Sequence, residues 1–252
     1  MSPAVSAAAA VVLGLLGLPV GAVLNLLIDR VPDRAPLAGA RDGEPVAPVR
    51  WGPLWAQPWL LRARVPRAAA PARWAWVELV TAVVLAVIGL RAGDSLAVVP
   101  LALLGASLVC VSVIDLQLLR IPDRITFPTL ALALPLVLLV SLRYDDGEAF
   151  AGGLIGSVTY FGALLLPHLV YPRGMGFGDV KLALVMGLYL GWRGWTPDHP
   201  VAGPIQHVLY GLMLGCILGV VFGVGHQLVT RRRGEFPFGP ALALACLVVV
   251  LA

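Results

Sequence analysis

Long apolar stretches follow one another through almost the whole of this 252-residue sequence, and they limit its fold more than any other feature. A bilayer is crossed by helices of about 20 apolar residues or by closed barrels, because lipid cannot satisfy backbone polar groups. These stretches are too long and too continuous for barrel strands, in which apolar and polar residues alternate. The sequence therefore predicts an all-α, polytopic integral membrane protein.

Eight stretches qualify, and we expect about eight transmembrane helices. Charged residues make up only 13% of the chain, against about 25% in an ordinary soluble domain. No basic residue precedes Arg30, so the first stretch lacks the basic start of a cleavable signal peptide and is expected to be a retained span. The expected spans are residues 4–28, 74–90, 96–114, 125–142, 150–170, 177–195, 208–229 and 236–252.

Basic residues cluster between these spans and indicate the orientation of the chain, because short loops rich in arginine and lysine stay in the cytoplasm. If both termini lie on the outer side, fifteen of the eighteen basic residues fall in cytoplasmic segments. These segments are residues 29–73, 115–124, 171–181 and 230–235. No basic helix interleaved with aromatic residues is present, so the clustering predicts topology and no nucleic-acid partner. We expect one membrane-embedded domain over residues 1–252, with a cytoplasmic loop at 29–73 and a helical core at 74–252.

Two aspartates stand apart because each lies directly at the end of an apolar stretch. Asp115 follows the third predicted span, and Asp179 precedes the apolar part of the sixth. Both are expected at cytoplasmic ends of spans and therefore at the same membrane depth. Either acid alone is explained as a solvated charge that marks the border of the bilayer.

The residues around each aspartate favour a site at which the two carboxyl groups meet. Pro122 ends any helix after Asp115, so the chain must turn before the next span. The glycines of "GMGFGD" before Asp179 suggest tight packing, unusual dihedrals or close approach by another chain. Two carboxyl groups that share one water can hydrolyse a peptide bond, one acting as the base and the other as the acid.

Substrate contacts are expected beside this pair. A strip of glycines leaves backbone amides and carbonyls open, so that an extended peptide can pair with it as a strand does. Lys181, the only lysine, either meets an acidic residue of the substrate or extends its ammonium group to the membrane interface. The expected substrate-binding residues are Gly174, Gly176, Gly178 and Lys181.

Six segments resemble, in the same order, those of the type IV prepilin peptidases, which are bacterial GxGD membrane aspartic proteases. The family pattern "IDLxxxxIPD" is matched at residues 114–123, and "GMGxGDxKL" is matched at residues 174–182. The other four segments are "GAVLNLLIDRVP" at 21–32, "WVELVTA" at 76–82, "ITFP" at 125–128 and "FPFGPALAL" at 236–244. The resemblance spans nearly the whole chain.

The resemblance implies an aspartic endopeptidase whose catalytic residues are Asp115 and Asp179. Such an enzyme removes the short basic leader from prepilin or pseudopilin precursors, just before their hydrophobic segment, at the cytoplasmic face of the bacterial cell membrane. It uses no metal or other cofactor for proteolysis. Four further residues match family positions and are candidates for supporting roles. They are Asp123, expected mainly in a turn or helix cap, Glu78, expected to pair with an arginine, Asn25 and Arg30.

One part of the resemblance is missing. Many members carry two CxxC pairs in the first cytoplasmic loop and use S-adenosylmethionine to methylate the new amino terminus. Residues 29–73 contain no cysteine, so no zinc bound by cysteine is expected there, and S-adenosylmethionine is expected only if methylation is retained. Two alternatives stay open: a proton- or ion-coupled transporter that uses the same acid pair, and a non-catalytic membrane subunit that keeps the fold.

Overall fold

The computed structural model describes residues 3–30, 73–93, 95–172, 176–230 and 237–252, and these residues form eight helices and no strand. The expected cytoplasmic loop at 29–73 lies almost wholly outside the described residues. The helices are α1 (Pro3–Arg30), α3 (Arg73–Ala92), α4 (Val98–Leu118), α5 (Asp123–Arg143), α6 (Gly147–Val170), α7 (Phe177–Gly194), α8 (Ala202–Thr230) and α9 (Gly239–Leu251).

Each predicted apolar stretch corresponds to one of these helices within a few residues at its ends, so the prediction of an all-α, polytopic membrane protein is confirmed. Six helices, namely α1, α3, α4, α5, α6 and α8, are long and apolar enough to cross a bilayer. The other two differ: α7 has 18 residues and includes Asp179, Lys181 and Arg193, and α9 has only 13 residues. At 1.5 Å per residue, α9 is about 20 Å long, shorter than a hydrocarbon core of roughly 30 Å.

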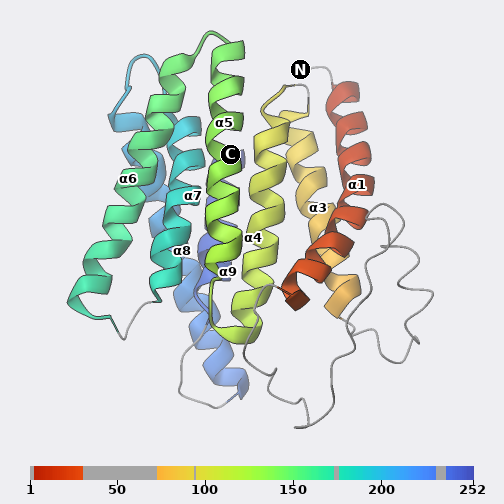
Figure 1. Ribbon diagram of the computed structural model, residues 1–252, viewed down its shortest axis with the longest axis vertical. Helices are drawn as coiled ribbons and strands as arrows, with labels where there is room; N and C mark the ends of the chain where they lie inside the picture. The colour runs from red at the N-terminus through yellow and green to blue at the C-terminus, as the bar shows by residue number, and fades with distance from the viewer. Residues whose placement is uncertain (1–2, 31–72, 94, 173–175, 231–236) are drawn as a thin grey trace.

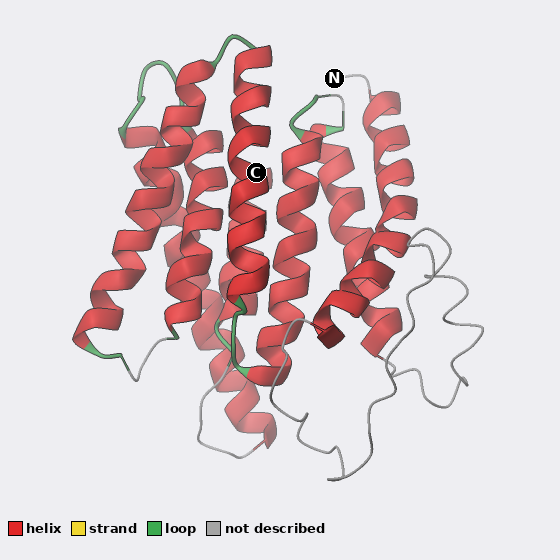
Figure 2. Ribbon diagram, viewed as in Figure 1, coloured by secondary structure: helices red, strands yellow, loops and turns green. Residues whose placement is uncertain are grey.

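The helices run alternately up and down, so successive connections lie at opposite ends of the bundle (Figure 1). α4 ends and α5 begins at the lower end in this view, where α6 also ends and α7 and α9 begin. The short loops after α3, α5 and α7 lie at the opposite end (Figure 2). Asp115 near the end of α4 and Asp179 near the start of α7 are therefore at the same end of the bundle.

α7 lies within the bundle and is buried along most of its length, with Met186 and Leu190 fully shielded. Its backbone approaches α6 closely: a Cβ atom at Gly156 of α6 would lie only 2.4 Å from the carbonyl oxygen of Gly187. Glycine alone permits this distance, and small residues favour such close packing between membrane helices. Contacts along most of α7 therefore fix the position of the helix that carries Asp179.

α1 and α3 form a second closely packed pair, at the right of Figure 1. A Cβ atom at Gly17 would lie 2.4 Å from Cα of Ala82, and one at Gly21 would lie 2.5 Å from Cα of Glu78. The glycines of α1 thus allow the two backbones to touch. The exposed side chains of this pair, and those of the other outer helices, are largely apolar, as expected for surfaces that face lipid.

Candidate active site

The chain turns sharply after Asp115. α4 ends at Leu118, and Leu119 adopts the left-handed conformation with φ 52°, its N–H donating to the carbonyl oxygen of Asp115 over 2.9 Å. A residue in this conformation closes many helices. Pro122 then takes an extended conformation and stands as the N-cap of α5. The predicted helix break before Asp123 is therefore observed.

Asp115 is held in place by a helix that lies far away in the sequence. Its side chain is only 6% exposed, and its Oδ2 accepts a hydrogen bond from the backbone N–H of Gly239 over 3.0 Å. Gly239 is the first residue of α9, where backbone N–H groups have no partner within the helix. A Cβ atom at position 239 would lie 2.8 Å from the same oxygen, so the carboxyl group requires glycine here.

Asp179 enters the site from the first turn of α7. Its side chain is 8% exposed, and its backbone N–H donates to the carbonyl oxygen of Gly176 over 3.2 Å. The Oδ1 atom of Asp179 is buried and has no hydrogen-bond partner among the described residues. A buried carboxyl oxygen left without a partner is rare, and it indicates a place for water or another polar ligand.

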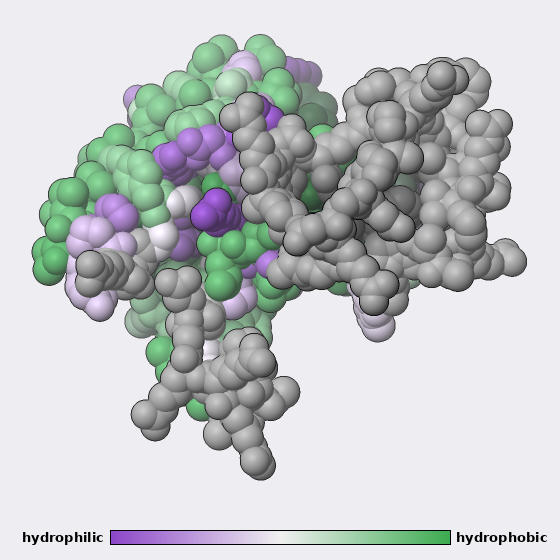
Figure 3. All heavy atoms as spheres, turned by 60° about the horizontal axis from the view of Figure 1, so that its bottom comes forward, coloured by the Kyte–Doolittle hydropathy of each residue, from purple (hydrophilic) through white to green (hydrophobic). Residues whose placement is uncertain are grey.

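The two aspartates line one cavity of about 220 Å³. This volume has room for more than one water molecule. Seen from this end, hydrophilic side chains gather near the middle of the described face, beside apolar ones (Figure 3). The other lining residues come from the turn after α4 and the start of α7, and they are Leu119, Arg120, Ile121, Gly176, Phe177 and Gly178. The structure therefore brings together the two residues that the sequence singled out.

The glycines before Asp179 have different surroundings. A Cβ atom at Gly178 would lie 2.8 Å from Cβ of Ile121 and 3.3 Å from its backbone nitrogen, so Gly178 lets α7 lie against the turn after α4. A Cβ atom at Gly176 would meet only the Oδ2 of Asp179, at 3.4 Å, and the N of Gly178, at 4.0 Å. Gly174 lies outside the described residues. Tight packing thus accounts for Gly178, and Gly176 keeps the more open backbone.

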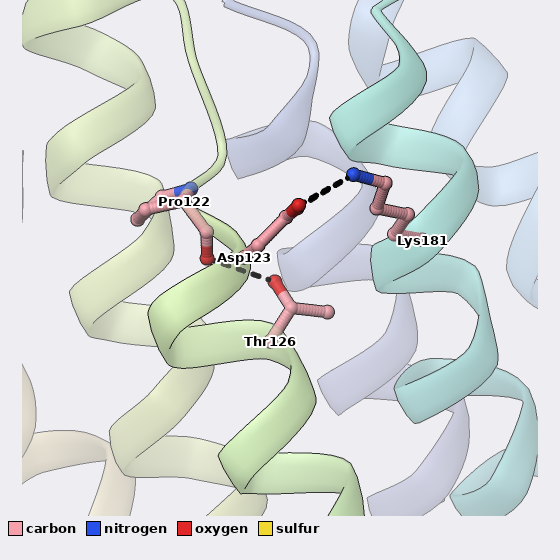
Figure 4. Close-up of polar contacts among 4 residues, drawn as sticks. All are labelled: Pro122, Asp123, Thr126 and Lys181. Atoms are coloured by element: carbon pink, nitrogen blue, oxygen red, sulfur yellow. Dashed lines mark hydrogen bonds and ion pairs between the residues drawn. The ribbon is translucent and has the colours of Figure 1, made fainter.

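Lys181 and Asp123 are ion-paired beside this cavity. The Lys181 Nζ lies 2.7 Å from both carboxylate oxygens of Asp123 and also lies over the rings of Phe177 and Phe127, at 4.9 and 5.8 Å from their centroids. In Figure 4 the two charged side chains reach toward each other from α7 and α5. Asp123 is the first residue of α5, directly after the turn, and Pro122 occupies the N-cap position.

Asn25 and Glu78, two of the other candidate supporting residues, are not among those that line the cavity. They are 1% and 7% exposed and belong to the closely packed pair α1 and α3. Arg30 is the last residue of α1, and its side chain lies outside the described part of the chain. Their suggested roles at the site stay predictions.

Two residues at the site were not identified from the sequence. Arg120 lines the cavity and supplies a cation beside the two acids, but in the sequence it is one arginine among many at the membrane border. Gly239 contacts Asp115, although it follows that residue by more than a hundred positions. In the sequence, Gly239 belongs to the "FPFGPALAL" segment, which indicated a resemblance to a family but did not predict a contact with Asp115.

Comparison with known proteins gives a family match over the part of the chain that contains both aspartates. A sequence model described as "Type IV leader peptidase family" matches residues 102–224, a range that includes both aspartates. No solved structure gives a significant match to the chain.

Several similar proteins carry the name prepilin leader peptidase/N-methyltransferase. The one from Aeromonas salmonicida (strain A449) is 31% identical over 215 residues, which cover 84% of this chain and 69% of that protein. The one from Aeromonas hydrophila is 33% identical over 79% of this chain and 65% of its own length, and the one from Xanthomonas campestris pv. campestris is 28% identical over 93% and 88%. The extent of these similarities, together with the match around Asp115 and Asp179, shows that this chain belongs to the type IV leader peptidase family.

Proposed function

We propose that this chain is an aspartic endopeptidase that removes the leader peptide from prepilin or pseudopilin precursors. The observation that carries the proposal is the shared cavity, which Asp115 of α4 and Asp179 of α7 line together. The names of the relatives support the substrate class, because each is called a prepilin leader peptidase. The two buried carboxyl groups support the aspartic type of catalysis.

The chemistry requires one carboxylate and one protonated carboxyl group. The carboxylate takes a proton from a water molecule as the water oxygen attacks the carbonyl carbon of the scissile bond, and the other aspartate donates its proton to the carbonyl oxygen. The resulting tetrahedral intermediate collapses when the C–N bond breaks: the leaving nitrogen takes the proton that the first aspartate removed from water, and the second aspartate regains its proton from a hydroxyl group of the intermediate. The products are a leader with a new carboxyl group and a mature chain with a new amino group.

The surroundings of the two aspartates suit a reaction in which one carboxyl group accepts a proton from water and the other donates a proton to the carbonyl oxygen. The Gly239 N–H holds one oxygen of Asp115, which fixes the orientation of that carboxyl group. Asp179 keeps a buried oxygen without a protein partner among the described residues, so this oxygen is available to a water molecule. We therefore place the attacking water between the two side chains, next to Oδ1 of Asp179.

We place the extended substrate backbone along Gly176, which lines the cavity and has few close neighbours, and the role of Gly174 in binding substrate stays a prediction. Gly178 is less suitable for this role because Ile121 packs against it. Because Lys181 is already paired with Asp123, we assign it a role in holding together the segments beside the cavity rather than in binding substrate.

We also propose that the acid pair faces the cytoplasm across the bacterial cell membrane. The two aspartates lie at the end of the bundle at which α1, α4, α6 and α8 end (Figure 1). In the sequence, the connections that follow these four helices are the arginine-rich ones. Loops with this charge stay on the cytoplasmic side. A transporter is less well supported, because transport sites lie near the middle of the bilayer, whereas the residues that line this cavity lie at the end of α4 and the start of α7.

Methylation of the new amino terminus is not part of the proposal. The relatives are named for both activities, but residues 29–73 of this chain contain none of its three cysteines. S-adenosylmethionine would be needed only for the methyl transfer and not for proteolysis. The mass of the amino-terminal peptide of a cleaved pilin, with and without S-adenosylmethionine, decides whether this chain adds a methyl group.

The test is leader removal in cells that co-express the chain with a prepilin. Asp115→Asn and Asp179→Asn should each abolish cleavage at unchanged membrane levels, because each removes a group that must carry or accept a proton. Asp198→Asn, in the loop after α7 at the opposite end of the bundle, is the matched control and should leave cleavage as in the wild type. Cleavage retained in either variant of the pair would exclude that aspartate from catalysis.

A further inference from the structure

An apolar groove opens on the side of the bundle between α3, α4, α8 and α9. Its volume is about 550 Å³, more than twice that of the cavity with the two aspartates. Among its described lining residues, Trp76, Ser112 and Gln117 alone have polar side-chain atoms. The rest are aliphatic residues, Phe222 and Pro240. The groove is therefore built to hold an apolar ligand.

The groove reaches the catalytic end of the molecule. Leu116 and Gln117, which line it, directly follow Asp115, and Pro240 directly follows the glycine whose N–H binds the Asp115 carboxyl group. From Leu108 to Gln117 the lining follows α4 for about 14 Å, which is the length of roughly two and a half helical turns. One end of the groove thus lies beside the reacting group, and the other lies deeper along the helices.

We propose that this groove binds the apolar helix that follows the scissile bond of the precursor, an inference that rests on the proposed function. A peptide bond held between Asp115 and Asp179 lies at the border of the membrane, and the chain beyond it must leave the small polar cavity and enter lipid. The groove is the apolar space that begins next to Asp115. The length of the lining along α4 matches the first turns of such a helix.

Close packing supplies the binding energy in this setting. Lipid tails are as apolar as the ligand, so a helix associates inside a bilayer through shape complementarity and not through escape from water. Ala243 and Ser112 are small and let a second helix approach the groove closely, while Trp76 and Phe222 are large and partly exposed. A straight lipid chain could fill the same space, and the experiment below separates the two ligands.

Photo-crosslinking tests the proposal in native membranes. A photo-reactive phenylalanine analogue is placed at position 80 or 244, both in the groove, or at position 79 as the matched control. Val80 and Leu79 are adjacent on α3 and 46% and 50% exposed, but only Val80 lines the groove. The probe is a peptide with a basic leader followed by an apolar helix of about 20 residues, and Asp115→Asn keeps it uncut.

We expect crosslinks from positions 80 and 244 to the first turns of the apolar helix and none from position 79. Equal crosslinking from all three positions, or crosslinks to lipid alone, would overturn the groove proposal. The wild-type chain is tested for cleavage of the same peptide. Cleavage without crosslinks from the groove positions would contradict only the proposal that the groove binds the apolar helix. Absence of cleavage would contradict the proposed peptidase function as well.

A variant that fills the groove with a larger side chain provides a second test of the proposal. Val80→Trp fills the groove and should raise KM for the peptide about tenfold, with a much smaller change in kcat, because it competes with helix binding. Leu79→Trp adds the same side chain on a face outside the groove and should change KM less than about twofold. Similar KM values for the two variants would contradict the proposal.

Discussion

Lys181 and Asp123 join the start of α7 to the start of α5, with the lysine Nζ 2.7 Å from each carboxylate oxygen. Lys181 is two residues from Asp179, and Asp123 is two residues from Ile121, which also lines the cavity. The ion pair therefore connects the two segments that form the walls of the site. A contact in this position is suited to setting the distance between the aspartates.

The ion pair is predicted to matter more for activity than for stability. Asp123 is 53% exposed and Lys181 is 21% exposed, so solvent screens their attraction and Lys181→Met should lower the free energy of unfolding by less than about 1 kcal/mol. Leader cleavage should fall about tenfold, because a displacement of Asp179 by an ångström disturbs the shared water. Cleavage rates and thermal unfolding in detergent measure the two effects.

The control for this prediction is the exchange of the two charges. Lys181→Asp combined with Asp123→Lys should recover part of the activity that either single change removes. Equal losses in the single and double variants would show that the attraction between these side chains does not position the site.

Gly178→Ala is predicted to disturb the catalytic end. Its Cβ would lie 2.8 Å from Cβ of Ile121, so the turn after α4 must move, at a cost of about 1–3 kcal/mol in stability. Cleavage should fall by more than about tenfold, because Ile121 and Asp179 line the same cavity. Gly162→Ala is the matched control, since nothing lies within 4 Å of its Cβ position, and wild-type activity is expected there. Equal activity in the two variants would contradict the close approach at Gly178.

Gly239→Ala is predicted to act through Asp115. The new Cβ would lie 2.8 Å from Oδ2 of Asp115 and would force the carboxyl group away from the N–H that holds it. The expected result is a fall in kcat of about tenfold or more with little change in KM, because the reacting group and not the groove is displaced. Gly225→Ala, with no atom within 4 Å of its Cβ position, should behave as the wild type. A change confined to KM would argue against the contact with Asp115.

A hydrogen bond at the opposite end of the bundle predicts loss of stability without loss of catalysis. The Trp192 Nε1–H donates to Oγ of Ser141 over 3.0 Å, and both residues are buried. Ser141→Ala leaves this donor without its acceptor and should lower the free energy of unfolding by about 1–3 kcal/mol. In Ser107→Ala the lost hydroxyl donates only within its own helix, to Leu104, so a smaller change is expected. Both variants should cleave the precursor at the wild-type rate at temperatures where they are folded.

The helices, and the position of both aspartates at one end of the bundle, could be predicted from the sequence because each depends on a local pattern. Apolar stretches determine where helices form in lipid. α4 ends shortly after Asp115, and α7 begins shortly before Asp179. The alternation of the helices then requires both acids to lie at the same end of the bundle. Neither conclusion needs knowledge of how the helices pack.

The contacts that orient the acids could not be predicted, because they join residues far apart in the chain. Gly239 and Asp115 meet only through the packing of α9 against α4. Lys181 and Asp123 each had a sufficient explanation by itself, at the interface or at a helix start, so nothing in the sequence pointed to their ion pair. A single sequence shows which side chains are present, but it does not show which residues they contact in the folded protein.

The hydrogen bond from Gly239 also bears on the order in which the protein is made. A nascent chain that has emerged as far as α8 already carries both aspartates, but α9, which orients one of them, is still to be synthesised. Until that helix inserts, the Asp115 carboxyl group lacks its backbone donor. Newly inserted molecules are thus expected to become competent for hydrolysis only once their insertion is nearly finished.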